Sequence, residues 1–166
     1  MKLRLRYPTN LVNGQLNLLD SHDVPRFLSL CRGDLRKWKL ACILLVLFPG
    51  VPSLFYGDEQ AICGMKEHEY RNPMVWSQNP QLYEFVQKII KIRKEYIEED
   101  TSYEVLWEET DERVLTFVRD GRKGRLFVSL NVSEMDQEWN REEKNMILAS
   151  TGNKELLEAM GYKLYL

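Results

Sequence analysis

The 166-residue chain lacks the features that mark several classes of protein. Its three cysteines, an odd number with no C-x-x-C spacing, indicate neither a complete set of intrachain disulfides nor a zinc motif. The net charge is only −2, so no electrostatic attraction to nucleic acid or to an anionic membrane is expected. The chain contains no internal repeat and no low-complexity tract, so it is expected to be an ordinary globular protein.

Long apolar runs are also missing. The longest, Leu40 to Phe48, has about half the length that a membrane span requires. The N-terminal stretch Met1 to Pro8 is basic but lacks the apolar core of a secretory signal. With the free thiols expected from the cysteine count, these absences predict a cytoplasmic protein without a membrane partner. No cofactor is expected either.

What is present begins with the pattern of a strand, a helix and a second strand. Leu16–Ser21 and Val51–Tyr56 are apolar segments too short for helices. Between them, apolar residues recur at helical spacing over 35–48, directly after Asp34 as the N-cap. Such a βαβ unit requires parallel strands and a right-handed crossover.

The second half of the chain changes from helical to alternating periodicity. After a polar connection over 57–78, Asn79-Pro80 predicts the start of a helix that runs to about residue 97. The acidic stretch Glu98 to Asp100 marks a boundary, so we expect one domain over 1–100 and another over 101–166. Strands with a period of two are predicted in the second domain, the second and third of them joined by a turn. They cover Tyr103–Trp107, Val114–Val118, Leu126–Leu130, Met146–Leu148 and Tyr162–Tyr165, and the turn covers Asp120–Gly124.

Three polar stretches follow the predicted strands, and together they carry a resemblance. They are Asp20-Ser21-His22-Asp23, Tyr56-Gly57-Asp58-Glu59 and Arg71-Asn72-Pro73-Met74-Val75-Trp76. In this order and spacing they resemble the α-amylase superfamily, family 13 of the glycoside hydrolases, in the style of its neopullulanase and cyclomaltodextrinase branch. The resemblance implies the last βα units, strands 7 and 8, of a TIM (β/α)8 barrel over 1–100. A small antiparallel β-sandwich would follow over 101–166.

The resemblance also implies roles for individual residues. Asp23 corresponds to the family's third catalytic carboxylate, which hydrogen-bonds sugar hydroxyls instead of attacking the sugar, and His22 is a second hydroxyl contact. Such bonds strengthen as the sugar ring flattens toward the transition state. The remaining residues expected to bind substrate line the pocket floor or the far side of the cleaved bond, where aromatic faces stack on sugars. They are Arg26, Tyr56, Asp58, Arg71 and Trp76.

Plainer structural readings of the same residues stay open at this point. Asp23 could cap a turn, and Arg26 could be a surface charge or a partner of Asp23 at a helix start. Tyr56, Asp58 and Glu59 could serve the fold alone, and Arg71 and Trp76 could anchor a loop beneath the helix over 80–97. A metal site built from Glu67, His68 and Glu69 lacks ligand spacing, so no metal is predicted.

Two functional hypotheses follow. In the first, the chain is a C-terminal fragment of an α-glucan or maltooligosaccharide hydrolase. It is inactive alone, because the family's nucleophile and general acid lie on earlier strands, and it either self-associates or joins a missing N-terminal barrel half. The alternative is a non-catalytic carbohydrate-binding or interaction module that uses Tyr103, Trp107 and Trp139 for stacking. Against it, the alternating pattern places Trp107 in the core.

Overall fold

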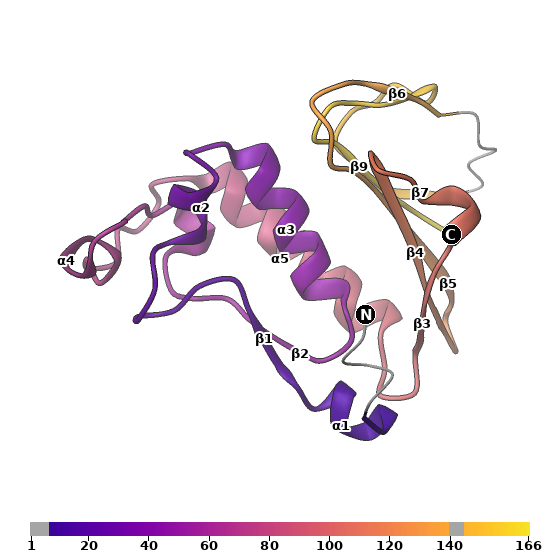
Figure 1. The fold of residues 1–166 in the computed structure, drawn as a ribbon, viewed down its shortest axis with the longest axis horizontal. Helices are drawn as coiled ribbons and strands as arrows, with labels where there is room; N and C mark the ends of the chain where they lie inside the picture. The colour runs from indigo at the N-terminus through magenta and orange to yellow at the C-terminus, as the bar shows by residue number, and fades with distance from the viewer. Residues whose placement is uncertain (1–6, 140–144) are drawn as a thin grey trace. The chain divides into compact units, whose positions relative to one another are not determined.

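The computed structural model describes residues 7–139 and 145–166, and the chain divides into two compact units, Met1–Arg93 and Lys94–Leu166 (Figure 1). Each unit has buried apolar side chains of its own. The assignment of 1–100 and 101–166 to a barrel part and a sandwich stays a prediction.

The first unit is built on the predicted βαβ arrangement. Strands β1 (Leu16–Leu18) and β2 (Val51–Ser53) are paired in parallel, and helix α3 (Leu35–Leu47) connects them. Asp34 caps α3, since its carboxylate accepts a hydrogen bond of 2.9 Å from the Arg36 backbone nitrogen. The parallel pairing, the helix and its cap are therefore confirmed.

Both strands of this unit end earlier than the sequence predicts. Neither apolar segment continues as a strand to Ser21 or to Tyr56. Beyond the strand ends, carboxylates bind backbone nitrogens: Asp20 accepts from the Phe27 nitrogen at 2.7 Å, and Asp58 accepts from the Phe55 nitrogen at 3.1 Å. The candidate site residues begin in these two segments.

Helix α5 (Pro80–Tyr96) completes the first unit. It starts as predicted at Asn79, whose side chain accepts a hydrogen bond of 3.0 Å from the Leu82 nitrogen. Near its other end, Arg93 donates to the backbone carbonyls of Val46, Phe48 and Gly50, which fixes α5 to the end of α3. Buried apolar side chains line both helices, including Trp38, Ile43, Leu47, Leu82, Phe85 and Ile89.

Short helical segments complete this unit, two of them inside the connection over 57–78. They are α1 (Thr9–Asn13), α2 (Phe27–Leu30), the 3-10 turn η1 (Asp58–Gln60) and α4 (Glu67–Tyr70). Among the residues that the structure describes, no helix combines the length and the apolar character needed to cross a bilayer.

The second unit is an antiparallel β structure. A five-stranded sheet has the spatial order β3 (Ser102–Val105), β4 (Val114–Gly121), β5 (Gly124–Asn131), β9 (Tyr162–Tyr165) and β7 (Met146–Ala149). A separate two-stranded sheet pairs β6 (Gln137–Glu138) with β8 (Leu156–Leu157). The predicted β4–β5 hairpin is confirmed, but its turn is only Arg122-Lys123, because Gly121 pairs with Gly124.

The core of the second unit combines stacked rings with one buried amide. The Phe127 and Tyr165 rings stack with centroids 5.3 Å apart, and Trp139 meets Tyr165 edge-on at 5.7 Å. The Asn131 amide nitrogen donates to the carbonyls of Met135, Leu157 and Glu158. Because these carbonyls belong to two chain segments, one before β6 and one at the end of β8, Asn131 ties both segments to the main sheet.

Candidate functional site

The ends of two parallel strands bring the candidate site residues together. β1 and β2 run in the same direction, so the segments that follow them emerge at the same edge of the small sheet. His22 and Asp23 follow β1, and Tyr56 and Asp58 follow β2. In parallel α/β folds this edge is the usual place for binding residues, because the loops after the strands converge there.

The exposed part of the site is an ion-pair cluster of three side chains. His22 Nε2 lies 3.2 Å from Asp23 Oδ2, and these side chains are 67% and 64% exposed. Arg71 reaches the same carboxylate with Nη2 at 3.3 Å from Asp23 Oδ1, and its Nε donates to the His22 carbonyl at 2.8 Å. The structure therefore places three predicted site residues side by side and accessible to a ligand.

Glu67, which was considered from the sequence only as part of a metal site that is not predicted, is a fourth member of this cluster. Its carboxylate lies 2.8 Å from Arg71 Nη1, one helical turn away. Helix α4, which carries Glu67, is fixed at its start by Glu69, whose carboxylate accepts from the backbone nitrogens of Met65 and Lys66. Arg71 is thus shared between Glu67 on its own segment and Asp23 on the segment after β1.

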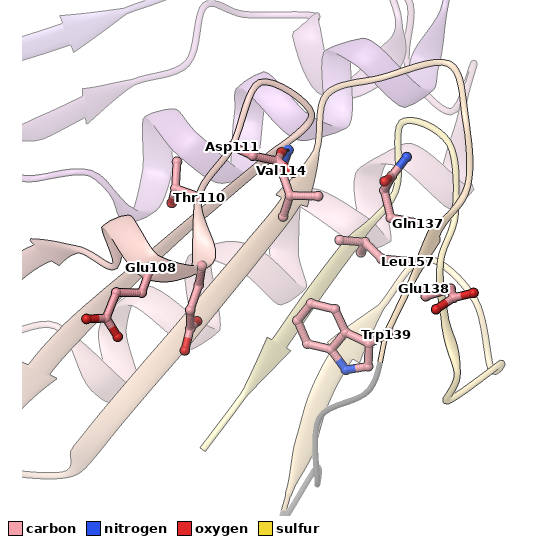
Figure 2. Close-up of a pocket in the computed structure, with 9 residues that line it drawn as sticks. Glu108, Thr110, Asp111, Val114, Gln137, Glu138, Trp139 and Leu157 are labelled. Atoms are coloured by element: carbon pink, nitrogen blue, oxygen red, sulfur yellow. Dashed lines mark hydrogen bonds between the residues drawn. The ribbon is translucent and has the colours of Figure 1, made fainter.

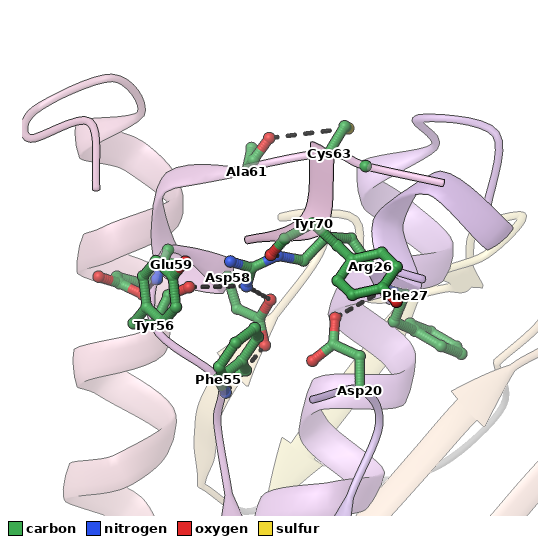
Figure 3. A network of polar contacts seen from close by, with 12 residues as sticks. Asp20, Arg26, Phe27, Phe55, Tyr56, Asp58, Glu59, Ala61, Cys63 and Tyr70 are labelled. Carbon is green, nitrogen blue, oxygen red and sulfur yellow. Dashed lines mark hydrogen bonds and ion pairs between the residues drawn. The ribbon is translucent and has the colours of Figure 1, made fainter. Parts of the chain in front are cut away.

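A buried charged group in the same unit consists of Asp20, Arg26 and Asp58 (Figure 3). Arg26 is 0% exposed, and its Nη1 lies 3.4 Å from Asp58 Oδ1. Burial, together with the neighbouring Asp20 carboxylate, raises the pKa of Asp58 to about 8. At neutral pH the Asp58 carboxyl group therefore keeps its proton beside the buried guanidinium.

These positions decide between the plainer readings of Arg26. Because Arg26 is fully buried, it is not a surface charge. Its carboxyl partner is Asp58, at 3.4 Å, and not Asp23, while Asp20 binds the start of α2 by accepting from the Phe27 nitrogen. Asp20 is also the residue of this group that the sequence analysis did not single out. An acidic residue two or three positions before a His-Asp pair is the only sequence signal for it.

Tyr56 and Trp76 occupy different surroundings. The Tyr56 hydroxyl donates to the Asn72 carbonyl at 2.8 Å, and its ring lies beneath the Arg26 guanidinium. Trp76 is 78% exposed, so it does not anchor the loop beneath α5. Its indole is available for stacking.

The second unit contains a pocket of about 250 Å³ (Figure 2). Four carboxylates and one buried indole line it: Glu108, Glu109, Asp111, Glu138 and Trp139. Asp111 is occupied structurally, because it accepts from the nitrogens of Arg113 and Val114. In the part of the chain that the structure describes, no three His, Cys, Asp or Glu side chains gather as a metal site.

The three aromatic residues of the alternative hypothesis do not form a row. Trp139 is buried, and Tyr103 packs against Phe117 with ring centroids 5.3 Å apart. Trp107, predicted to lie in the core, is 62% exposed, so that prediction is wrong. Its strand ends at Val105, and the chain turns into η2 (Trp107–Glu109), which removes Trp107 from the alternation.

Comparison with known proteins identifies relatives of the first unit. Residues 2–81 match the protein family described as alpha amylase, catalytic domain. The chain is 44% identical over 93 residues to a cyclomaltodextrinase of Geobacillus thermopakistaniensis and 39% identical over 95 residues to neopullulanase 2 of Thermoactinomyces vulgaris. These matches cover 54% and 55% of the chain but only 16% of each relative, so the chain spans a small part of their length.

A solved structure matches nearly the whole chain. A debranching enzyme of Nostoc punctiforme superposes on 99% of it with a TM-score of 0.83. That match covers 36% of the debranching enzyme, and the two sequences are 24% identical, so it bears on the fold alone.

Proposed function

We propose that the chain belongs to the alpha-amylase family, and that its first unit supplies the hydroxyl-binding part of an α-glucan hydrolase active site. The observation that carries the proposal is the exposed pair of His22 and Asp23, held 3.2 Å apart directly after β1. Asp23 is the catalytic carboxylate of the proposal, in the sense that it binds the reacting sugar.

The chemistry follows from the donors and acceptors of the cluster. A glucosyl unit presents neighbouring hydroxyls that both donate and accept hydrogen bonds. Asp23 accepts from one hydroxyl, while His22 and Arg71 supply donors beside it. When the ring flattens toward an oxocarbenium-like transition state, the hydrogen bonds to its hydroxyls strengthen. This stabilises the transition state by several kcal/mol.

The rest of the active site is assigned to protein outside the 166 residues. Retaining hydrolysis needs a nucleophilic carboxylate and a general acid about 5 Å apart. The other carboxyl groups near Asp23 already have structural partners: Asp20 binds the Phe27 nitrogen, Glu59 the Gly57 nitrogen and Glu67 the Arg71 guanidinium. We therefore propose that the chain is a C-terminal part of a hydrolase, inactive alone, completed by a further barrel part.

The finer assignments belong to the same proposal. β1 and β2 act as strands 7 and 8 of the barrel, and the second unit is the small β-sandwich that follows it. The names of the curated relatives support cyclic and linear α-glucans as the substrate class. The location is proposed to be cytoplasmic. Five further residues complete the proposed substrate site, either by contact with the substrate or by acting through neighbouring residues. They are Arg26, Tyr56, Asp58, Arg71 and Trp76.

The test is a titration of the 166-residue chain with maltotriose, followed by NMR. Signals of the Asp23 and Arg71 segments should shift, and Asp23→Asn should weaken binding about tenfold or more, as expected for loss of a charged hydrogen-bond partner. Asp120→Asn is the matched control, because Asp120 forms an exposed ion pair with Arg125 at 3.3 Å in the second unit. Equal binding by both variants would contradict the proposal.

The exposure of Trp107 keeps the carbohydrate-binding module as a second candidate. The same titration separates the two. If the module carries the function, Trp107→Ala should abolish maltotriose binding and Asp23→Asn should leave it unchanged. If the first unit carries the function, Asp23→Asn should weaken maltotriose binding and Trp107→Ala should leave it unchanged.

A further inference from the structure

We propose that Arg26 is the positioning residue of the site: its buried guanidinium fixes the segments that carry Tyr56 and Arg71 against the segment that carries His22 and Asp23. The inference deepens the proposed function and rests on it for the sugar-binding role of the exposed cluster. It assigns Arg26 an action through its neighbours, without contact with the substrate.

The argument starts with the contacts of the Arg26 side chain. Nε donates to the Tyr70 carbonyl at 3.1 Å, and Nη1 donates to the Tyr56 carbonyl at 2.6 Å. The guanidinium carbon lies 4.1 Å from the centre of the Phe55 ring (Figure 3). One side chain that is fully buried thus joins two loops that are more than ten residues apart in the sequence.

The first of these contacts acts directly on Arg71, because Tyr70 is the residue before it. The same loop is held a second time by the Arg26 backbone, whose nitrogen donates to the Gly64 carbonyl at 2.9 Å. Gly64 in turn packs so closely on the loop end that a Cβ there would lie 2.5 Å from the Tyr70 nitrogen. Residues 64–70 are therefore closed into a tight loop whose two ends both bind Arg26.

The second contact reaches Arg71 from its other side. Arg26 holds the Tyr56 carbonyl, and the Tyr56 hydroxyl donates to the Asn72 carbonyl at 2.8 Å. Both neighbours of Arg71 in the chain, Tyr70 and Asn72, are thus held by groups that Arg26 positions. The Arg71 side chain then reaches the His22 carbonyl and the Asp23 carboxylate from this fixed backbone.

A lysine could not make the same set of contacts. The planar guanidinium presents donors in a fixed fork, and its central carbon lies 4.1 Å and 4.7 Å from the ring centres of Phe55 and Tyr56, whereas an ammonium is a single compact point of charge. The position of the buried guanidinium is also marked by Asp58, whose Oδ1 lies 3.4 Å from Nη1. Arg26→Lys therefore preserves the charge while removing the geometry.

The first arm of the test uses the unaltered 166-residue chain. With 15N-labelled arginine, NMR reports the exchange of each Nε proton with solvent. If Arg26 positions Arg71, the Nε protons of both residues should be protected and should open together as denaturant is added at low concentration. An Arg71 proton that exchanges freely while the Arg26 proton stays protected would overturn the inference, and this arm needs no variant to fold.

The second arm compares Arg26→Lys with a matched control, Arg93→Lys. Arg93 also donates to backbone carbonyls inside the first unit, at Phe48 and Gly50, but none of its partners carries a site residue. Arg26→Lys should speed exchange of the Arg71 Nε proton about tenfold or more, and Arg93→Lys should leave it within about twofold. Equal effects of the two variants would reduce Arg26 to a purely structural residue and contradict the inference.

Maltotriose is the probe that separates this inference from the proposed function. If the unaltered chain binds maltotriose, Arg26→Lys should raise the dissociation constant about tenfold while Arg93→Lys should not. If the unaltered chain does not bind maltotriose, the proposed function fails. The exchange of the Arg71 proton still decides whether Arg26 positions the cluster.

Discussion

Arg71 Nε donates a hydrogen bond of 2.8 Å to the backbone carbonyl of His22, a residue 49 positions earlier in the chain. The same guanidinium binds the carboxylates of Asp23 and Glu67. The loop after β2 is thereby closed onto the end of β1. The exposed cluster exists only because these two segments meet.

The first prediction concerns Arg71→Ala. Ion pairs between exposed groups contribute little, so the free energy of unfolding should fall by less than about 1 kcal/mol. Binding of maltotriose should weaken clearly, because the His22–Asp23 segment loses its partner across the cluster. Urea unfolding and an NMR titration measure the two effects.

Arg125→Ala is the control for this variant. Arg125 is also about half exposed and pairs with Asp120 at 3.3 Å, but it lies in the second unit. Arg125→Ala should lower the free energy of unfolding by a similarly small amount and leave the binding of maltotriose unchanged. If Arg71→Ala behaved like Arg125→Ala in both measurements, Arg71 would have no part in the site.

The second prediction is a dependence of stability on pH that arises at Asp58. Burial and the Asp20 carboxylate raise the pKa of Asp58 from 3.8 to about 8 in the folded chain. Between these values the folded state keeps a proton that the unfolded state has lost. Its contribution to stability is therefore complete below pH 4 and is lost as the pH rises to about 8, with a slope of up to about 1.4 kcal/mol per pH unit.

Asp58→Asn should remove this dependence, because an amide does not titrate and mimics the protonated carboxyl group. Urea unfolding between pH 5 and pH 9 measures it. Asp120→Asn, which changes an exposed aspartate, should keep the slope of the unaltered chain. A slope in Asp58→Asn as steep as in the unaltered chain would show that the protonated group lies elsewhere.

The parts of the fold that were predictable are those set by local chemistry. Asp34 caps α3, and Asn79 with Pro80 starts α5, because capping depends on residues within one turn. The β4–β5 hairpin was likewise set by two apolar strands around a Gly-containing turn. The parallel pairing of β1 and β2 was predictable because a helix connects the two strands, and such a crossover joins parallel strands, whereas a tight turn joins antiparallel ones.

The parts that were not predictable depend on contacts between distant segments. The burial of Arg26 is decided by Tyr56 and Tyr70, and nothing near Arg26 in the sequence indicates it. Glu67 joins the site because α4 forms one turn before Arg71, inside a connection that has no helical periodicity. Trp107 is exposed because its strand ends two residues earlier than the alternation of apolar residues suggests.

The third prediction concerns self-association of the isolated chain. The small β1–β2 sheet exposes the apolar side chains of Leu16, Leu18 and Val51. A two-stranded sheet with unpaired edges is a template for further pairing, and we expect a second copy of the chain to cover it. Light scattering should show a mass that rises with concentration.

Leu16→Lys should oppose this association, because the substitution places a charge on the sheet edge. Leu11→Lys is the matched control: Leu11 and Leu16 are both 59% exposed, but Leu11 lies on α1. Leu16→Lys should be monomeric at concentrations where Leu11→Lys associates. A monomeric unaltered chain at high concentration would contradict the prediction.

The last prediction is that the 166-residue chain does not hydrolyse maltotriose, cyclomaltodextrin or pullulan above background. Asp23 can bind a sugar, but bond cleavage requires a nucleophile and a proton donor that act together, and losing such a pair costs several orders of magnitude in rate. Asp20 and Asp58 are buried and hydrogen-bonded to backbone nitrogens, and Glu59 binds the Gly57 nitrogen. If a separately expressed upstream barrel part restores activity, Asp23→Asn should abolish it while both parts still assemble. Turnover by the chain alone would mean that one of these three carboxyl groups leaves its backbone partner and acts on the sugar, and variants at Asp20, Asp58 and Glu59 would identify which.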